Sequence, residues 1–143
     1  MKGILRALTE NQAETDPTAT DCRLLGRTYA IPFEHVWQAA SKLASGDLRR
    51  WSLWVADDQA GLIEASTRPF LFGAAGDVRI KIGLDENAQT RVDLSVASRT
   101  ERGDLGHSRR AIGRFLHRLD GVLNAGPGQI LDATRTVTWR DLR

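Results

Sequence analysis

The stretch DVRIKIGLDENAQTRVDLSVAS, residues 77–98, decides the fold of this chain. Apolar residues occupy every second position on both sides of a polar turn at 85–89: Val78, Ile80, Ile82 and Leu84 before it, and Val92, Leu94 and Val96 after it. A period of two is typical of antiparallel strands that bury one face and expose the other. The stretch therefore predicts two long paired strands joined by a tight turn.

The same period continues upstream. Trp51, Leu53 and Val55 alternate with polar or exposed positions, a turn is expected at 57–61, and residues 62–68 return as another strand. We expect Trp51, Leu53 and Val55 to share the buried face and Trp54 to lie on the opposite face. Before them, residues 23–31 are predicted as the first strand, which ends at Pro32.

A first helix is predicted directly after that strand. Pro32 suits a first helical turn, and Glu34 is favoured near the positive end of a helix. Apolar residues then recur at helical spacing: Phe33, Val36, Trp37, Ala40, Leu43 and Ala44. The helix is expected to stop at Ser45-Gly46-Asp47.

A second, longer helix is predicted over residues 105–123. Its apolar residues form one stripe: Leu105, Ile112, Phe115, Leu116, Leu119, Val122 and Leu123. Arg110, Arg114 and Arg118 lie opposite this stripe, and Gly126-Pro127 follows the helix in the order expected of a C-terminus.

These elements predict an α+β fold in the order β-α-β-β-β-β-α, with a curved antiparallel sheet packed on a long C-terminal helix in a helix-grip-like arrangement. The chain of 143 residues has the length of one domain. We expect a flexible N-terminal arm at 1–21, the α+β domain at 22–125, and a tail at 126–143 whose residues 134–139 form a short strand or pack across the surface.

Composition excludes several classes of site. The single cysteine, Cys22, cannot form an internal disulfide, and no His/Cys cluster has metal-ligand spacing, so neither a metal nor a cofactor is expected. A formal charge of +2 is too small to indicate a nucleic-acid partner on its own. No apolar run resembles a signal peptide or a membrane span, so a cytoplasmic location is expected. Nothing in the sequence indicates an oligomeric state.

The segment 98–110, SRTERGDLGHSRR, is the densest in polar groups. In a structural interpretation, Asp104 caps the long helix, Gly103 and Gly106 allow a tight turn or close approach of the backbone, and Arg99 pairs with Asp104 or caps a neighbouring carbonyl. Ser98 and Asp77 belong to the same structural motif. The segment would then act as a clasp between the last strand and the helix.

In a functional interpretation the same segment binds an anion. A helix N-terminus surrounded by arginines favours a phosphate or carboxylate, and the candidate residues are Arg99, Arg102, Asp104, Arg109 and Arg110. Arg110, Arg114 and Arg118 also share one helix face, which could meet an acidic lipid surface or an acidic protein. No aromatic residues lie among these arginines, which makes nucleic acid an unlikely partner.

No catalytic residues are assigned. Ser98, Asp104 and His107 have the residue types of a hydrolase triad, but such triads are defined by geometry, and the chain has no G-x-S-x-G motif.

The chain resembles domain of unknown function family 1499, a family of bacteria and plant plastids, over residues 24–123. The resemblance rests on Ile31-Pro32 before Val36-Trp37, on GLIEA at 61–65, on Asp77-Val78, and above all on Ser98-Arg99 followed by Asp104-Leu105-Gly106 and Arg109. This chain departs from the family pattern at Gly76, Glu101, Ser108 and Ala111, and it lacks the N-terminal cysteine element of many members. The resemblance implies no activity.

Three functions are therefore weighed. The first is a non-enzymatic binding module for a small hydrophobic or anionic ligand, with an apolar cavity between sheet and helix and Phe70-Leu71-Phe72 as a lid. The second is a protein-interaction or envelope-associated accessory domain that uses the arginine stripe. The third is an enzyme of unspecified class.

Overall fold

The computed structural model describes residues 12–15, 26–68, 75–98 and 105–131. All strands pair antiparallel in one sheet with the order β1-β6-β5-β4-β3, and β2 also pairs with β6. The strands are β1 (Gln12–Glu14), β2 (Arg27–Tyr29), β3 (Trp51–Asp57), β4 (Leu62–Thr67), β5 (Gly76–Leu84) and β6 (Thr90–Ser98). The helices are α2 (Phe33–Lys42), its π-helical continuation η2 (Leu43–Asp47), and α3 (Leu105–Val122).

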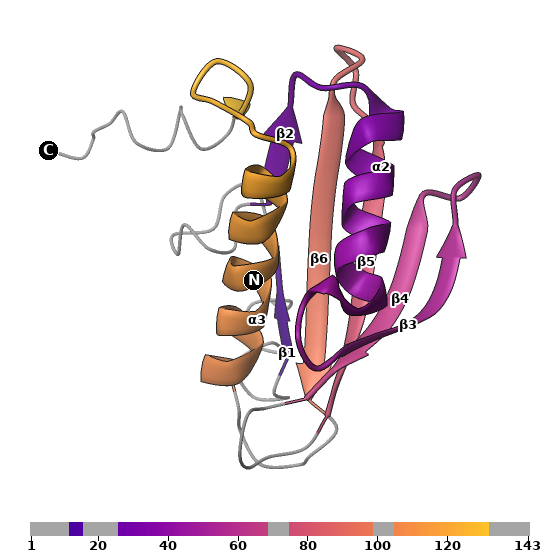
Figure 1. The fold of residues 1–143 in the computed structure, drawn as a ribbon, viewed down its shortest axis with the longest axis vertical. Coiled ribbons are helices and arrows are strands. Elements are labelled where there is room, and N and C mark those ends of the chain that lie inside the picture. Colours follow the sequence, from indigo (N-terminus) through magenta and orange to yellow (C-terminus); the bar gives the residue numbers. More distant parts are fainter. Residues whose placement is uncertain (1–11, 16–25, 69–74, 99–104, 132–143) are drawn as a thin grey trace, which may run out of the picture.

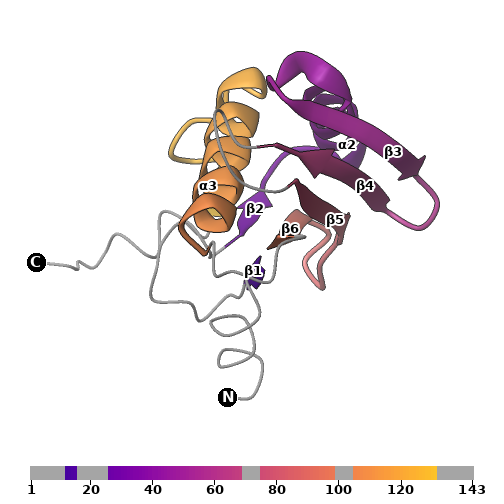
Figure 2. The same ribbon diagram turned by 90° about the horizontal axis from the view of Figure 1, so that it is seen from below.

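The predicted fold class is confirmed. Both helices cover the same face of the sheet, and the twisted strands curve around them (Figures 1 and 2). We call the helix-covered side the inner face and the opposite side the outer face. The long helix α3 begins at Leu105, as its apolar stripe predicted, and ends one residue earlier than expected.

The core lies between the inner face and the two helices. Val78, Ile80 and Ile82 of β5 and Val92, Leu94 and Val96 of β6 are buried as predicted, because every second side chain points toward the helices. Leu84, which was expected to continue this buried series, is instead 61% exposed at the end of β5. Trp51 of β3 packs on Phe115 of α3 with 5.2 Å between the ring centroids. This contact holds the start of β3 against the middle of α3.

Local sequence accounts for the ends of the helices. Pro32 precedes the first turn of α2 with φ −58° and ψ 148°, and Glu34 lies in that turn. At the other end, Gly46 has φ 137°, a conformation that suits glycine, and the helix stops there as expected. Asn124, with φ 53°, takes the left-handed position after α3.

The edge of β6 is shared by two short strands. β1 pairs with Ser95–Ala97 and β2 with Thr90–Val92. Residues 1–21 were expected to form a flexible arm, but Gln12–Glu14 belong to the sheet because their backbone completes the edge of β6. In the C-terminal segment, Ile130 makes a single bridge to Tyr29, while the expected strand at 134–139 lies outside the described residues.

The expected alternation in β3 is wrong after Leu53. The pairing with β4 shifts between Leu53 and Val55, which is a β-bulge at Trp54. Leu53 pairs with the inner-face residue Ala65, whereas Val55 pairs with the outer-face residue Glu64. The extra residue therefore moves Val55 to the outer face, where it follows Trp54, and Leu53 itself is 38% exposed at the edge of the core.

Candidate functional site

The junction between β6 and α3 lies where the sequence predicted it. Ser98 ends β6 and pairs with Gly76 of β5, and α3 begins at Leu105 with Gly106 in its first turn. Asp77 is the next residue of β5 and lies on the outer face, where it is exposed. Ser98 and Asp77 are thus on neighbouring strands at the end of the sheet where α3 starts (Figure 1).

Most residues of the predicted clasp and anion site belong to the segment 99–104, between β6 and α3. Arg99, Arg102 and Asp104 lie outside the described residues, so the Asp104 cap and the anion site stay predictions. Arg109 and Arg110 are both in α3: Arg109 is half-buried with its Nε enclosed, and Arg110 is exposed. These two candidates therefore point into different environments.

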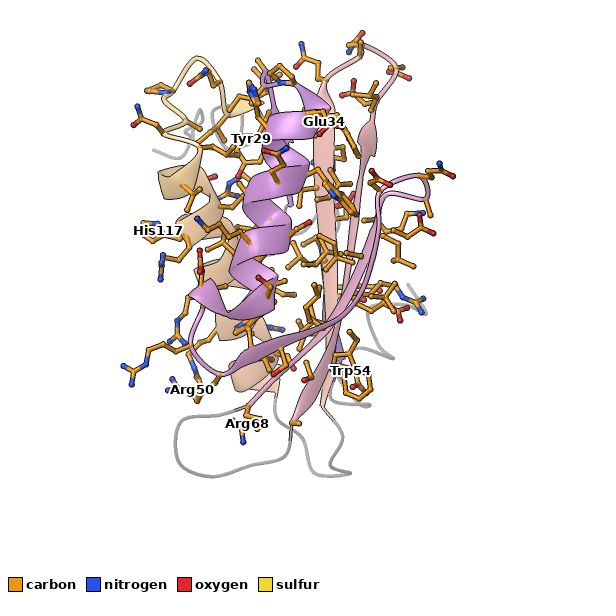
Figure 3. All side chains as sticks on the ribbon, turned by 45° about the vertical axis from the view of Figure 1, so that its right-hand side comes forward. Tyr29, Glu34, Arg50, Trp54, Arg68 and His117 are labelled. Atoms are coloured by element: carbon orange, nitrogen blue, oxygen red, sulfur yellow. The ribbon has the colours of Figure 1, made fainter. Side chains whose placement is uncertain are left out.

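The side chains of the stripe Arg110, Arg114 and Arg118 are exposed on α3. Arg49 and Arg68 are also exposed, and we call these five residues the arginine face. The Arg68 N–H donates to the Arg50 carbonyl at 3.1 Å, which brings the start of β3 and the end of β4 together. Figure 3 shows Arg50 and Arg68 near each other at the lower end of the view.

The packing of Trp51 on Phe115 brings the start of β3 against α3. Arg49 lies two residues before Trp51, and Arg114 directly precedes Phe115. The ion pairs between described residues involve Arg27, Arg79 and Arg91, and none includes an arginine of the arginine face. The sequence revealed the stripe on α3, but only the tertiary contact could add Arg49 and Arg68 to it.

A second cluster joins β2 to the C-terminal part of α3. The hydroxyl of the buried Tyr29 donates to Asp120 Oδ1 at 2.5 Å, and Arg27 donates to the same carboxylate from Nε and Nη2 at 3.2 Å. Only 16% of the Arg27 side chain and 19% of the Asp120 side chain are exposed. Sequence reasoning missed this cluster, because 91 residues separate Tyr29 from Asp120 and no local pattern links them.

The chemistry of the cluster of Arg27, Tyr29 and Asp120 indicates a structural role. Burial of the phenol, followed by the negative charge of Asp120 and the hydrogen bond to it, raises the pKa of Tyr29 far above its ordinary value, and Arg27 only partly opposes this. A phenol with such a pKa stays protonated and does not act as a base at neutral pH. Its role is to donate to Asp120 and so hold β2 against α3.

A shallow groove of about 410 Å³ crosses the outer face of the sheet. Trp54 and Val55 of β3 form one end, and the polar residues Glu64, Asp77, Arg79 and Ser95 continue it across β4, β5 and β6. Trp54 is 67% exposed, yet its Nε1–H donates to Ser66 Oγ at 3.1 Å. The β-bulge creates this site, since it places Trp54 and Val55 together on the outer face.

Within the described ranges, no group of three or more His, Cys, Asp or Glu side chains is arranged to hold a metal ion. In the same part of the chain, no helix combines the length and the apolar character needed to cross a membrane.

Comparison with known proteins yields one match. The sequence model of a family described as protein of unknown function (DUF1499) matches residues 8–119. It begins upstream of β1, and so includes part of the segment expected to be an arm. No curated protein and no solved structure matches the chain. Because the match extends over most of the sequence, the chain belongs to the DUF1499 family of proteins of unknown function.

Proposed function

We propose that this protein is a non-enzymatic binding module that docks on an anionic lipid surface through the arginine face. The observation that carries this proposal is the exposure of Arg49, Arg68, Arg110, Arg114 and Arg118 without an acidic partner among the described residues. Arginines without a carboxylate partner keep their full charge available to an anionic surface.

The size of the arginine face suits an extended surface. Arg110 and Arg118 are eight residues apart on one helix, which corresponds to about 12 Å along its axis. Arg49 and Arg68 extend the charge sideways, from α3 to the adjoining end of the sheet. A broad, one-sided distribution of cations matches an anionic membrane better than it matches a single phosphate.

An acidic protein is the weaker candidate for the partner. Stable protein interfaces contain an apolar or aromatic centre that is buried on binding. The large exposed apolar residues of the described chain are Leu53, Trp54, Val55, Leu84 and Val122, and among them only Val122 belongs to α3. The arginine face therefore lacks anchors of that kind, and its attraction would be mainly electrostatic and sensitive to salt.

Co-sedimentation with vesicles tests the proposal. Full-length protein should bind vesicles of phosphatidylcholine with 30 mol% phosphatidylglycerol at ~20 mM NaCl, should dissociate as the salt rises toward ~500 mM, and should not bind pure phosphatidylcholine. Each basic residue near an anionic surface contributes about 1 kcal/mol, so the double variant Arg110→Glu, Arg114→Glu should bind at least about thirtyfold more weakly.

The matched control makes the same charge change on the outer face, with Arg79→Glu and Lys81→Glu. It should retain most of the binding, and thermal melts should show both double variants folded. Equal loss in the two variants would mean that only net charge matters and would contradict the proposal. Binding to soluble polyglutamate but not to anionic vesicles would assign the arginine face to an acidic protein and refute the lipid surface.

A further inference from the structure

The groove on the outer face is independent of the arginine face and has a different chemistry. We infer that it binds a neutral, polyhydroxylated ligand, specifically a short oligosaccharide that stacks on Trp54. The inference rests on the exposed indole, on the mixed polar groups beside it, and on the length of the groove.

Trp54 presents an apolar surface that is already positioned. Its only polar ring atom, Nε1, donates to Ser66 Oγ at 3.1 Å, so the 67% of the residue that is exposed consists mainly of ring carbon atoms. Because the hydrogen bond restrains the ring, a ligand would lose little free energy in ordering it. A flat aromatic surface of this kind can pack against the C–H groups of a sugar ring.

The polar lining supplies both hydrogen-bond donors and acceptors. Arg79 Nη2 donates to Glu64 Oε2 at 2.9 Å, an exposed ion pair that holds both groups on the floor of the groove. Asp77 adds acceptors, and the Ser95 hydroxyl can donate or accept. Sugar hydroxyls also donate and accept, so they can satisfy such a mixed set.

The same lining disfavours the other ligand classes. A purely hydrophobic ligand would remove Glu64, Asp77 and Arg79 from water without replacing their hydrogen bonds. An anion would meet two carboxylates and one guanidinium, which gives a net repulsive charge. A cation could interact with the Trp54 ring, but Arg79 lies in the same groove and opposes it.

The length of the groove suits more than one sugar unit. It touches β3, β4, β5 and β6, and neighbouring strands are about 4.8 Å apart, so it extends roughly 14 Å across the sheet. That length corresponds to a chain of two or three sugar rings lying across the strands. The groove is shallow and polar, so we expect weak binding with fast exchange.

A glycan array followed by NMR tests this inference. The labelled full-length protein is applied to an array of neutral, sialylated and sulfated oligosaccharides, and the best neutral ligand is titrated into ¹⁵N-labelled protein. The Trp54 indole N–H resonance, assigned with Trp54→Phe, should shift together with backbone amides of β4 and β5. Trp54→Ala should weaken binding at least tenfold, and Arg79→Ala should weaken it measurably.

Leu53→Ala is the matched control. Leu53 is adjacent and also exposed, but it does not line the groove, so its loss should leave binding unchanged. Three outcomes would overturn the inference: no glycan bound by the wild type, glycan binding that Trp54→Ala does not affect, or a preference for sulfated or sialylated glycans. Titration with choline is a further check, and a Trp54-dependent shift with choline but with no glycan would assign the groove to a cation instead.

Discussion

Raising the pH should leave Tyr29 protonated for as long as the protein is folded. Tyr29 is the only tyrosine of the chain, so the rise of absorbance near 295 nm with pH, which is due to tyrosinate, reports on this residue above the constant contribution of the four tryptophans. Its hydroxyl is buried and donates to Asp120, and these surroundings raise its pKa far above the ordinary value. An exposed tyrosine has a pKa of about 10 and would ionise in the folded protein.

The difference between the pKa of Tyr29 in the folded protein and in the unfolded chain links pH to stability. Above pH ~10 the unfolded chain loses the phenolic proton while the folded protein keeps it, so the free energy of unfolding falls as the pH rises. For one tyrosine with an unfolded pKa near 10, the loss between pH 9 and pH 11 is about 1.4 kcal/mol. Arginines remain charged over this range and do not contribute to the slope.

The assay combines two measurements on the same samples. Absorbance at 295 nm is followed from pH 8 to pH 12 with and without denaturant, and urea melts are recorded at pH 9 and pH 11. Tyrosinate should appear near pH 10 only in denaturant, and Tyr29→Phe should lack most of the alkaline loss of stability. A tyrosinate signal with a midpoint near pH 10, in protein whose near-ultraviolet circular dichroism is still native, would refute the buried hydrogen bond to Asp120.

The other stability predictions concern the same cluster and one turn. Asp120→Ala removes the carboxylate that accepts from the buried Tyr29 phenol and the mostly buried Arg27 guanidinium, so urea melts should show a loss of about 2–4 kcal/mol in the free energy of unfolding. Glu64→Ala, which breaks an exposed ion pair, should cost under about 1 kcal/mol. Similar losses in the two variants would contradict the structural role of the Asp120 cluster. Gly61→Ala should lower the free energy of unfolding by more than about 2 kcal/mol, because φ is +67° and the added Cβ would lie 2.1 Å from the Ile82 carbonyl oxygen. In Gly83→Ala the added Cβ meets no atom within 4 Å, so urea melts should show a nearly unchanged stability.

Much of the fold could be predicted from the sequence, because the signals are local. The alternation in β5 and β6 and the buried side of α3 follow from which side of a strand or helix faces the core, and the structure confirms them over the middle of each element. At the ends, Leu84 of β5 and Val122 of α3 were expected on the buried side and are exposed. The end of the first helix, where η2 stops at Gly46-Asp47, depends on the backbone freedom of Gly46, and it too was confirmed. The stripe Arg110, Arg114 and Arg118 is exposed for the same local reason.

Only the tertiary structure decided which distant residues meet. The bulge at Trp54 depends on the register between β3 and β4, and a single extra residue reversed the expected face of Val55. The contact between Tyr29 and Asp120, and the packing of Trp51 on Phe115, depend on how the helices pack on the sheet. Sequence periodicity shows which side of an element is buried, whereas a binding surface is formed by sides of several elements, and their relative placement is set by packing alone.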